Sequence, residues 1–317
     1  MNVYLTFDIE VWCNGWDDLD RVFPASFERY VYGRSSHGDY ALPKTLELLS
    51  QHGLQGVFFV EPLFATRFGQ QHLNTIVRLI RDAGHDVQLH LHPEWTDEAL
   101  EPLIADCATK RQHLSYYTLD EQTALIACGK KMLEAAGSGP IHAFRSGSFA
   151  VNADSFEALR HNQIFLDSSL NRCHAVSAPD LLQGHDLDTV FEITGVTTFP
   201  VTVFQDGFGK DRPAQVGACS FAEMRDALWS AQRAGAAHFV LVSHNFEMLK
   251  PGQSQPDWVV VQRFAQLCAF LQQHRGTFTV GSFGEFDALP ATMAQQPRAG
   301  WAATGRRYAE QAVRRVL

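Results

Sequence analysis

Paired cysteines and long apolar runs are both missing from this 317-residue sequence. The six cysteines form no Cys-x-x-Cys pair and have no zinc-knuckle spacing, which argues against a disulfide framework and against structural zinc. No stretch of about 18 consecutive apolar residues occurs, and the first residues have the pattern of a strand rather than of a secretory signal. These absences favour a cytoplasmic protein without a membrane span.

Positive charge is scarce as well. The chain has 26 Lys and Arg residues against 35 Asp and Glu residues, a formal net charge of −9. Because phosphate backbones attract basic proteins, nucleic-acid binding is not expected. The charge is uneven: residues 291–317 carry five arginines and one glutamate, a net +4, which leaves −13 for residues 1–290.

This difference in charge predicts one domain over residues 1–290 and a basic helical tail over residues 291–317. Tyr308–Leu317 has the spacing of an amphipathic helix. One interpretation docks this helix on the domain with its arginines in water. The other places it against an anionic membrane surface, as a peripheral contact.

Hydrophobic residues make up 45% of the chain, enough for a large core. Apolar runs alternate with amphipathic stretches, and several of the stretches end at a glycine. We expect strands at residues 3–7, 56–60, 86–92, 141–144, 164–167, 238–243 and 277–280, and helices at residues 42–49, 73–80, 119–136, 155–160, 221–234 and 259–274. Such alternation predicts an α/β protein in which helical crossovers join parallel strands.

Functional groups of parallel α/β proteins lie at the carboxyl ends of the strands. The first expected strand ends in Asp8-Ile9-Glu10, and strand alternation points both carboxylates to the same side. Two neighbouring carboxylates repel each other unless a cation, an arginine or a proton lies between them. Asp8 and Glu10 are therefore site candidates, in preference to a helix cap or a surface turn.

Histidine is abundant, with 14 residues, and it serves both as metal ligand and as proton carrier. On the third expected strand, His90 and His92 share one face and are placed to converge on a metal. A helical turn after His90 would instead bring Glu94 alongside it. Both geometries suit Zn²⁺, which accepts imidazole nitrogen and carboxylate oxygen.

Three more strand ends carry polar side chains. Arg145 leaves an apolar run into a Ser/Gly turn, where it can hold a carboxylate bidentately. Asp167 ends the strand of residues 164–167. His244 follows the strand of residues 238–243, a position that suits a general acid whose pKa is tuned by a neighbouring carboxylate. The alternatives are an ordinary exposed arginine and a capped loop histidine.

In this order, these segments resemble the motifs of the polysaccharide deacetylase family, carbohydrate esterase family four. The resemblance covers about residues 3–285. It rests on Thr6-Phe7-Asp8-Ile9-Glu10, Gly84-His85 followed by His90-Leu91-His92-Pro93-Glu94, Arg145-Ser146-Gly147, Asp167-Ser168-Ser169 and Leu241-Val242-Ser243-His244. It implies a distorted (β/α)₇ barrel, a divalent metal that is usually zinc, and hydrolysis of an acetyl group on a sugar.

The resemblance also implies roles for individual residues. Asp8 would be the general base, Glu10 and His90 metal ligands, and Arg145 the group that restrains Asp8. His244 would be the general acid, with Asp167 as its partner. The chain departs from the family pattern in the second motif, where the third ligand is Glu94 by register or His92 by chemistry; zinc chemistry and strand alternation favour His92.

The expected function is metal-dependent removal of an N-acetyl group from a sugar, in a nucleotide-, lipid- or polymer-linked precursor of a surface polysaccharide. A metal-independent amidohydrolase on the same fold and an inactive barrel that serves as a binding subunit are the alternatives. A retaining glycosidase would need Asp8 and Glu10 as its carboxylate pair and would leave the histidines unexplained.

Overall fold

The computed structural model describes residues 1–174, 185–283 and 295–316. The chain divides into two compact units. Unit 1 comprises Met1–Gly56 with Val201–Leu317, and unit 2 comprises Val57–Pro200. The domain boundary expected between residues 290 and 291 lies outside the described residues.

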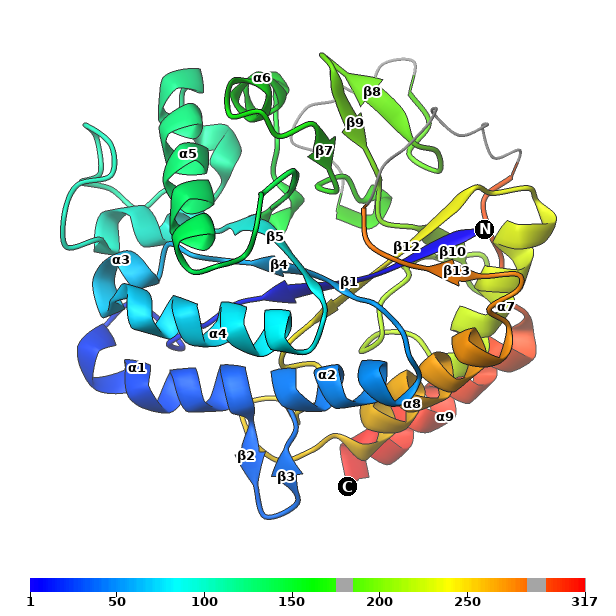
Figure 1. Cartoon of the computed structure of the whole chain (residues 1–317). Coiled ribbons are helices and arrows are strands. Elements are labelled where there is room, and N and C mark those ends of the chain that lie inside the picture. The colour runs from blue at the N-terminus through cyan, green and yellow to red at the C-terminus, as the bar shows by residue number, and fades with distance from the viewer. Residues whose placement is uncertain (175–184, 284–294, 317) are drawn as a thin grey trace. The chain divides into compact units, whose positions relative to one another are not determined.

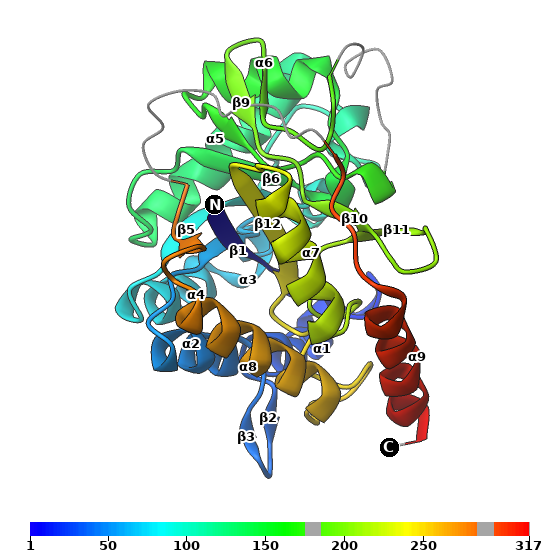
Figure 2. The same ribbon diagram turned by 90° about the vertical axis from the view of Figure 1, so that its right-hand side faces the viewer.

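Unit 1 is built around strand β1 (Asn2–Ile9), which pairs in parallel with β12 (His238–His244) and with β13 (Thr279–Val280). Every residue of β1 from Val3 onward is buried, as expected for a parallel strand covered on both faces. The helices of the unit are α1 (Leu19–Phe27), a π-helix (Glu28–Tyr32), α2 (Leu42–Gln51), α7 (Phe221–Arg233), α8 (Trp258–Gln273) and α9 (Trp301–Val316). Helix α7 lies beside both α8 and α9 (Figures 1 and 2).

Two short antiparallel hairpins complete unit 1. They are β2 (Arg34–Ser35) with β3 (Gly38–Asp39), and β10 (Val203–Gln205) with β11 (Asp211–Pro213). The sequence pattern did not predict them, because a strand of two or three residues is too short to show alternation.

Helix α9 begins seven residues before the expected Tyr308–Leu317 segment, and one of its arginines, Arg307, is packed into unit 1. Arg307 is 1% exposed, and its guanidinium lies 2.8 Å from Oδ2 of Asp206 and 2.9 Å from Oε1 of Glu223. Leu317, the last residue of the expected helix, lies outside the described residues. Among the described helices, none has the length and apolarity needed to cross a membrane.

Unit 2 contains a sheet in which neighbouring strands from β4 through β5, β6, β7 and β9 pair in parallel, and β8 pairs antiparallel with β9. The strands are β4 (Val57–Val60), β5 (Asp86–Leu91), β6 (Ala143–Ser146), β7 (Leu166–Asp167), β8 (Phe191–Ile193) and β9 (Val196–Thr198). The helices are α3 (Ala65–Phe68), α4 (Gln70–Asp82), α5 (Leu119–Ala135) and α6 (Ala153–His161). Helices α4 and α5 contact each other and β5 (Figure 1).

Local sequence signals fix the ends of two of these helices. Thr118 and Glu121 form a reciprocal capping box at the start of α5, and Asn152 and Ser155 form one at the start of α6. Parallel strands joined by helices occur in both units, which confirms the expected α/β class.

Candidate active site

In unit 1, Asp8 and His244 stand at the ends of two paired strands. The parallel register of β1 and β12 places them opposite each other, although 236 positions separate them in the chain. Nε2 of His244 lies 4.0 Å from Oδ2 of Asp8, which is 2% exposed. An imidazole and a buried carboxylate thus face each other across the carboxyl edge of this strand pair.

The other ring nitrogen of His244 has a carboxylate partner of its own. Nδ1 lies 2.9 Å from Oε1 of Glu247. Burial lowers the pKa of His244, but the hydrogen bond to Glu247 and the charges of Glu10, Glu247 and Asp8 together raise it to about 9. At neutral pH the ring is therefore an imidazolium, able to give up a proton.

Glu247 is held firmly by its surroundings. Its Oε2 accepts hydrogen bonds from the backbone N–H of Gly217 at 2.6 Å and from the Ser243 hydroxyl at 3.1 Å. Its Oε1 accepts one from Nε2 of Gln215 at 2.6 Å. A Cβ at Gly217 would lie 2.8 Å from Oε2, so only glycine permits this approach. The sequence prediction missed Glu247, which lies in a loop three residues beyond His244.

Glu10 is buried next to this pair. Its Oε2 accepts a hydrogen bond from Nε1 of Trp12 at 2.6 Å. The Asn245 side chain bonds both the backbone N–H and the carbonyl of Glu10, each at 3.1 Å. Asn245, the neighbour of His244, therefore fixes the backbone of Glu10 as the chain leaves β1.

In unit 2, His90 is oriented by a backbone carbonyl. The register of β5 and β6 sets His90 opposite Arg145, and Nδ1 of His90 lies 2.8 Å from the carbonyl oxygen of Arg145. Since a carbonyl only accepts, Nδ1 must carry the proton, which leaves the lone pair on Nε2. A buried imidazole held in this tautomer is the usual form of a metal ligand.

His92 is oriented in the same way by a carboxylate. Its Nδ1 lies 3.2 and 3.3 Å from the two oxygens of Glu94. The ring centroids of His90 and His92 are 4.8 Å apart, and ligand atoms of the two rings lie within 4.8 Å of one another. Glu94 thus contacts Nδ1 of His92, which leaves Nε2 of that ring to offer its lone pair to a metal. Both histidines fit a divalent metal by tautomer, burial and spacing.

The sequence prediction missed a buried carboxylate that interacts electrostatically with His92 and Glu94. Glu61 directly follows β4, is 1% exposed, and accepts hydrogen bonds from the backbone N–H groups of Leu63 at 2.7 Å and Phe64 at 3.2 Å. Burial raises the pKa of Glu61 to about 8, with a smaller opposite effect from His92. Its place at a strand end, before Pro62, was the signal that could have found it.

Arg145 is fully buried in unit 2. It donates from Nε to the carbonyl oxygen of Ser168 at 3.0 Å and from Nη2 to the Ser168 hydroxyl at 2.9 Å. Its guanidinium lies 4.4 Å from the ring centroid of Phe59. These contacts fix the side chain of a charged group that would otherwise be costly to bury.

Asp167 supports the neighbouring turn. It accepts hydrogen bonds from the backbone N–H of Ser169 at 2.9 Å and from the Thr198 hydroxyl at 3.0 Å, and burial raises its pKa. The structure places Glu247, a residue of the same loop, on Nδ1 of His244. The expected pairing of Asp167 with His244 joins residues of the two units and stays a prediction.

No protein-family model matches the sequence, and no curated protein matches it. Among solved structures, the chain is similar to one from Mycobacterium smegmatis described as a candidate polysaccharide deacetylase. The two are 18% identical, with a TM-score of 0.54 over 90% of this chain and 94% of the other. A family 4 carbohydrate esterase from Streptomyces lividans, in complex with acetate, is 14% identical, with a TM-score of 0.46 over 92% of this chain and 97% of the other. A pseudoenzyme of that family from Bacillus anthracis is 14% identical, with a TM-score of 0.41 over 87% of this chain and 62% of the other.

The Mycobacterium smegmatis structure shows that this chain has the fold of the polysaccharide deacetylases, the distorted (β/α) barrel. The expected resemblance to that family is therefore confirmed at the level of the fold.

Proposed function

We propose that the chain is a metal-dependent carbohydrate deacetylase that removes an N-acetyl group from a sugar. The observation that carries this proposal is the arrangement of His244 between Asp8 and Glu247. It supplies a proton acceptor and a proton donor on adjacent strand ends, which amide hydrolysis needs because an unprotonated amine is a poor leaving group.

In this proposal His90, His92 and Glu10 hold the metal. Two imidazoles and one carboxylate form a donor set that zinc accepts, and all three residues are buried. When bound, the ion would polarise the acetamide carbonyl as a Lewis acid. Glu94 orients His92, and Glu61 is a further buried carboxylate that interacts electrostatically with both. The identity of the metal as zinc is part of the proposal.

The chain's own residues carry the proton transfers. Asp8 takes a proton from the attacking water, and Arg145, with Asp167 supporting the adjacent turn, restrains Asp8. His244 donates its proton to the nitrogen of the leaving amine while Glu247 keeps the ring in place. Water and the N-acetyl sugar are thereby converted into acetate and a free amino sugar.

We place the substrate among precursors of surface polysaccharides, with the sugar linked to a nucleotide, a lipid or a polymer. A cytoplasmic location belongs to this proposal, and the six cysteines support it, since all are free thiols. Peripheral contact of α9 with an anionic membrane also belongs to this proposal. Its support is the exposed set Trp301, Arg306, Tyr308 and Arg315.

The test is acetate release from a panel of N-acetylated sugars, measured beside the metal content of protein purified without chelator. Acetate release that requires the metal supports the proposal. Amide hydrolysis that survives complete removal of metal would instead identify a metal-independent amidohydrolase. Failure on every substrate, with sugar binding retained, would identify a binding subunit.

A further inference from the structure

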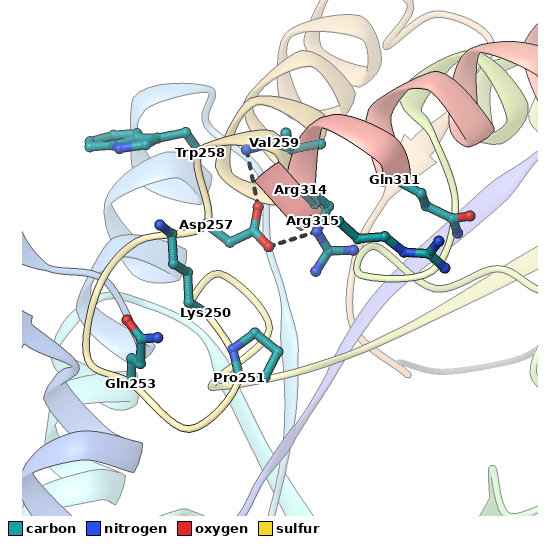
Figure 3. A pocket seen from close by; sticks show the side chains of 9 residues that line it. All are labelled: Lys250, Pro251, Gln253, Asp257, Trp258, Val259, Gln311, Arg314 and Arg315. Atoms are coloured by element: carbon teal, nitrogen blue, oxygen red, sulfur yellow. Dashed lines mark hydrogen bonds and ion pairs between the residues drawn. The ribbon is translucent and has the colours of Figure 1, made fainter. Parts of the chain in front are cut away.

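A cavity of about 640 Å³ lies in unit 1 (Figure 3). Its walls come from the loop after β12, the first turn of α8 and the last turns of α9. Its lining includes Lys250, Asp257, Trp258, Arg314 and Arg315. The volume falls within the roughly 300–1,000 Å³ typical of small-molecule sites. The deacetylation proposed above gives none of these residues a role.

The cavity is positively charged in an otherwise acidic chain. Three cationic side chains line it against one carboxylate, whereas the whole chain has a net charge of −9. The single carboxylate is already engaged, as Figure 3 shows. Asp257 accepts hydrogen bonds from the backbone N–H groups of Val259 at 3.2 Å and Val260 at 3.3 Å, and from Nε of Arg314 at 2.7 Å. Such a pocket favours an anion.

Arg314 is held in place by two hydrogen bonds and keeps a further N–H donor group. Its Nε bonds Asp257, and its Nη1 bonds the carbonyl oxygen of Gly217 at 3.3 Å. Nη2 makes no hydrogen bond to any described residue, and the side chain is 25% exposed. A guanidinium held in this way still has donors for the oxygens of a bound anion.

Trp258 adds an aromatic surface at the same cavity. It is 45% exposed, and its ring meets Tyr40 and His37 edge to face at centroid distances of 5.2 and 5.5 Å. These neighbours hold the indole in position while leaving much of it accessible. Exposed, fixed indoles bind planar bases and the apolar faces of sugars.

The cavity is near the proposed catalytic residues along the chain. Lys250 follows His244 by six residues, so their Cα atoms are at most about 20 Å apart. The connecting loop turns back on itself, since the backbone N–H of Leu249 bonds the carbonyl of Phe246 at 3.0 Å. An elongated substrate could therefore contact both places.

We propose that this cavity binds the phosphate-bearing portion of the substrate, so that the substrate is a phosphate or diphosphate ester of an N-acetylated sugar. The assignment of an acetylated sugar depends on the proposed function, whereas the assignment of a phosphate depends on the charge of the cavity. Figure 3 shows Arg314 between Lys250 on one side and Arg315 on the other, so Arg314 contacts the phosphate oxygens together with the cation on either side, and Trp258 lies beyond Lys250. A nucleotide and a lipid carrier both supply this chemistry.

The experiment compares two double variants that lose the same charge. Lys250→Gln with Arg315→Gln changes the cavity, and Lys210→Gln with Arg233→Gln changes exposed residues elsewhere. Binding is measured by calorimetry with UDP-N-acetylglucosamine, with vesicles of phosphatidic acid in phosphatidylcholine, and with the uncharged methyl glycoside of N-acetylglucosamine.

We expect a phosphate ester to bind and the cavity variant to weaken its affinity about ten-fold or more, because bonds to charged groups are lost. The control variant should leave that affinity unchanged, and neither variant should affect the methyl glycoside. Binding of the UDP-sugar identifies a nucleotide carrier. Binding of the vesicles alone identifies a lipid carrier when Lys250→Gln weakens it and Arg306→Gln, on the exposed side of α9, does not. Absence of binding by both phosphate probes, or equal weakening in both double variants, would overturn the proposal.

Acetate release from an uncharged N-acetylglucosamine oligomer separates this inference from the proposed function. The cavity variant should keep the wild-type rate on that oligomer. Acetate release without phosphate binding would refute the cavity alone. Phosphate binding without acetate release from any sugar would refute the deacetylase and leave the cavity as a phosphate site.

Discussion

Oε1 of Glu247 lies 2.9 Å from Nδ1 of His244, and this contact sets both the direction and the charge of the imidazole. The carboxylate is itself fixed, because its other oxygen accepts hydrogen bonds from Gly217 and Ser243. Glu247 is therefore a positioning residue, which acts on the substrate only through His244.

Replacing Glu247 by glutamine should move the alkaline limb of the reaction. The pKa of His244 is about 9, so the proton donor is present below that pH and is lost above it. Without the negative charge that pKa falls, and the alkaline limb of kcat/KM should move down by about one pH unit or more. A pH–rate profile measures this. The exposed Glu192→Gln variant should keep the wild-type limb, and an unshifted limb in Glu247→Gln would contradict the assignment.

The same ionisation affects stability. A histidine whose pKa is raised on folding stabilises the folded state fully below its ordinary pKa of 6.5, and this contribution disappears as the pH rises through about 9. Chemical denaturation of the wild type and of His244→Gln over this range should show the difference in unfolding free energy shrinking as pH increases. A constant difference would place the raised pKa in doubt.

Metal binding should depend on His90 and His92 differently from Glu94. Alanine at either histidine should abolish stoichiometric binding, because each provides a lone pair on Nε2. Glu94→Gln should keep one metal per chain with an affinity lowered roughly 10–100-fold, the usual cost of losing an outer partner of a ligand. Metal analysis with a competing chelator measures both. His161→Ala, at an exposed position, is the control. Loss of metal in Glu94→Gln with retention in His92→Ala would make Glu94 the ligand instead.

Gly147 should be essential for the position of His92. A Cβ there would lie 2.6 Å from Nδ1 of His92, closer than side chains pack, so Gly147→Ala must displace the imidazole. We expect metal affinity to fall about ten-fold or more, as for other disturbed ligand orientations. Gly276→Ala is the matched control, since a Cβ at that position meets nothing within 4 Å. Equal metal affinity in the two variants would show that the imidazole moves without cost.

Two neighbouring arginines of α9, Arg306 and Arg307, should differ in their contribution to the free energy of unfolding, because Arg306 is exposed and Arg307 is buried. Arg307→Ala removes the guanidinium that Asp206 and Glu223 share in the interior, which costs about 3–5 kcal/mol of unfolding free energy. Arg306→Ala, at an exposed position, should cost about 0.5 kcal/mol or less. Urea denaturation compares them, and a similar effect of both would mean that the buried ion pairs add little to the docking of α9.

Much of the candidate site could be predicted from the sequence, because parallel strands bring their carboxyl ends to one edge and apolar runs show where those ends are. This reasoning selected Asp8, His90, Arg145 and His244 as candidates, and the structure places them in β1, β5, β6 and β12. Glu247 was not, because a loop residue has no periodicity and its place depends on how the chain turns. The sequence also left undecided whether His92 or Glu94 is the third ligand. The residue pattern could not show that β5 ends at Leu91, before both of them.

The register of the strands is a second feature that could not be predicted from the sequence. Nothing in the sequence pattern sets Asp8 opposite His244, because their pairing depends on packing between segments far apart in the chain. For the same reason, the buried pairs of Arg307 were not expected: a docked helix was foreseen with its arginines in water, whereas Arg307 pairs with Asp206 and Glu223 inside unit 1.

The most direct test of the account is acetate release by metal-loaded protein from an N-acetylated sugar, compared among the wild type, Asp8→Asn and His244→Gln. Each substitution keeps the size of the side chain close to the original while removing its proton chemistry. We expect activity in the wild type and a loss of about 10²–10⁴ in kcat in either variant, with metal content unchanged. Wild-type rates in both variants would contradict it.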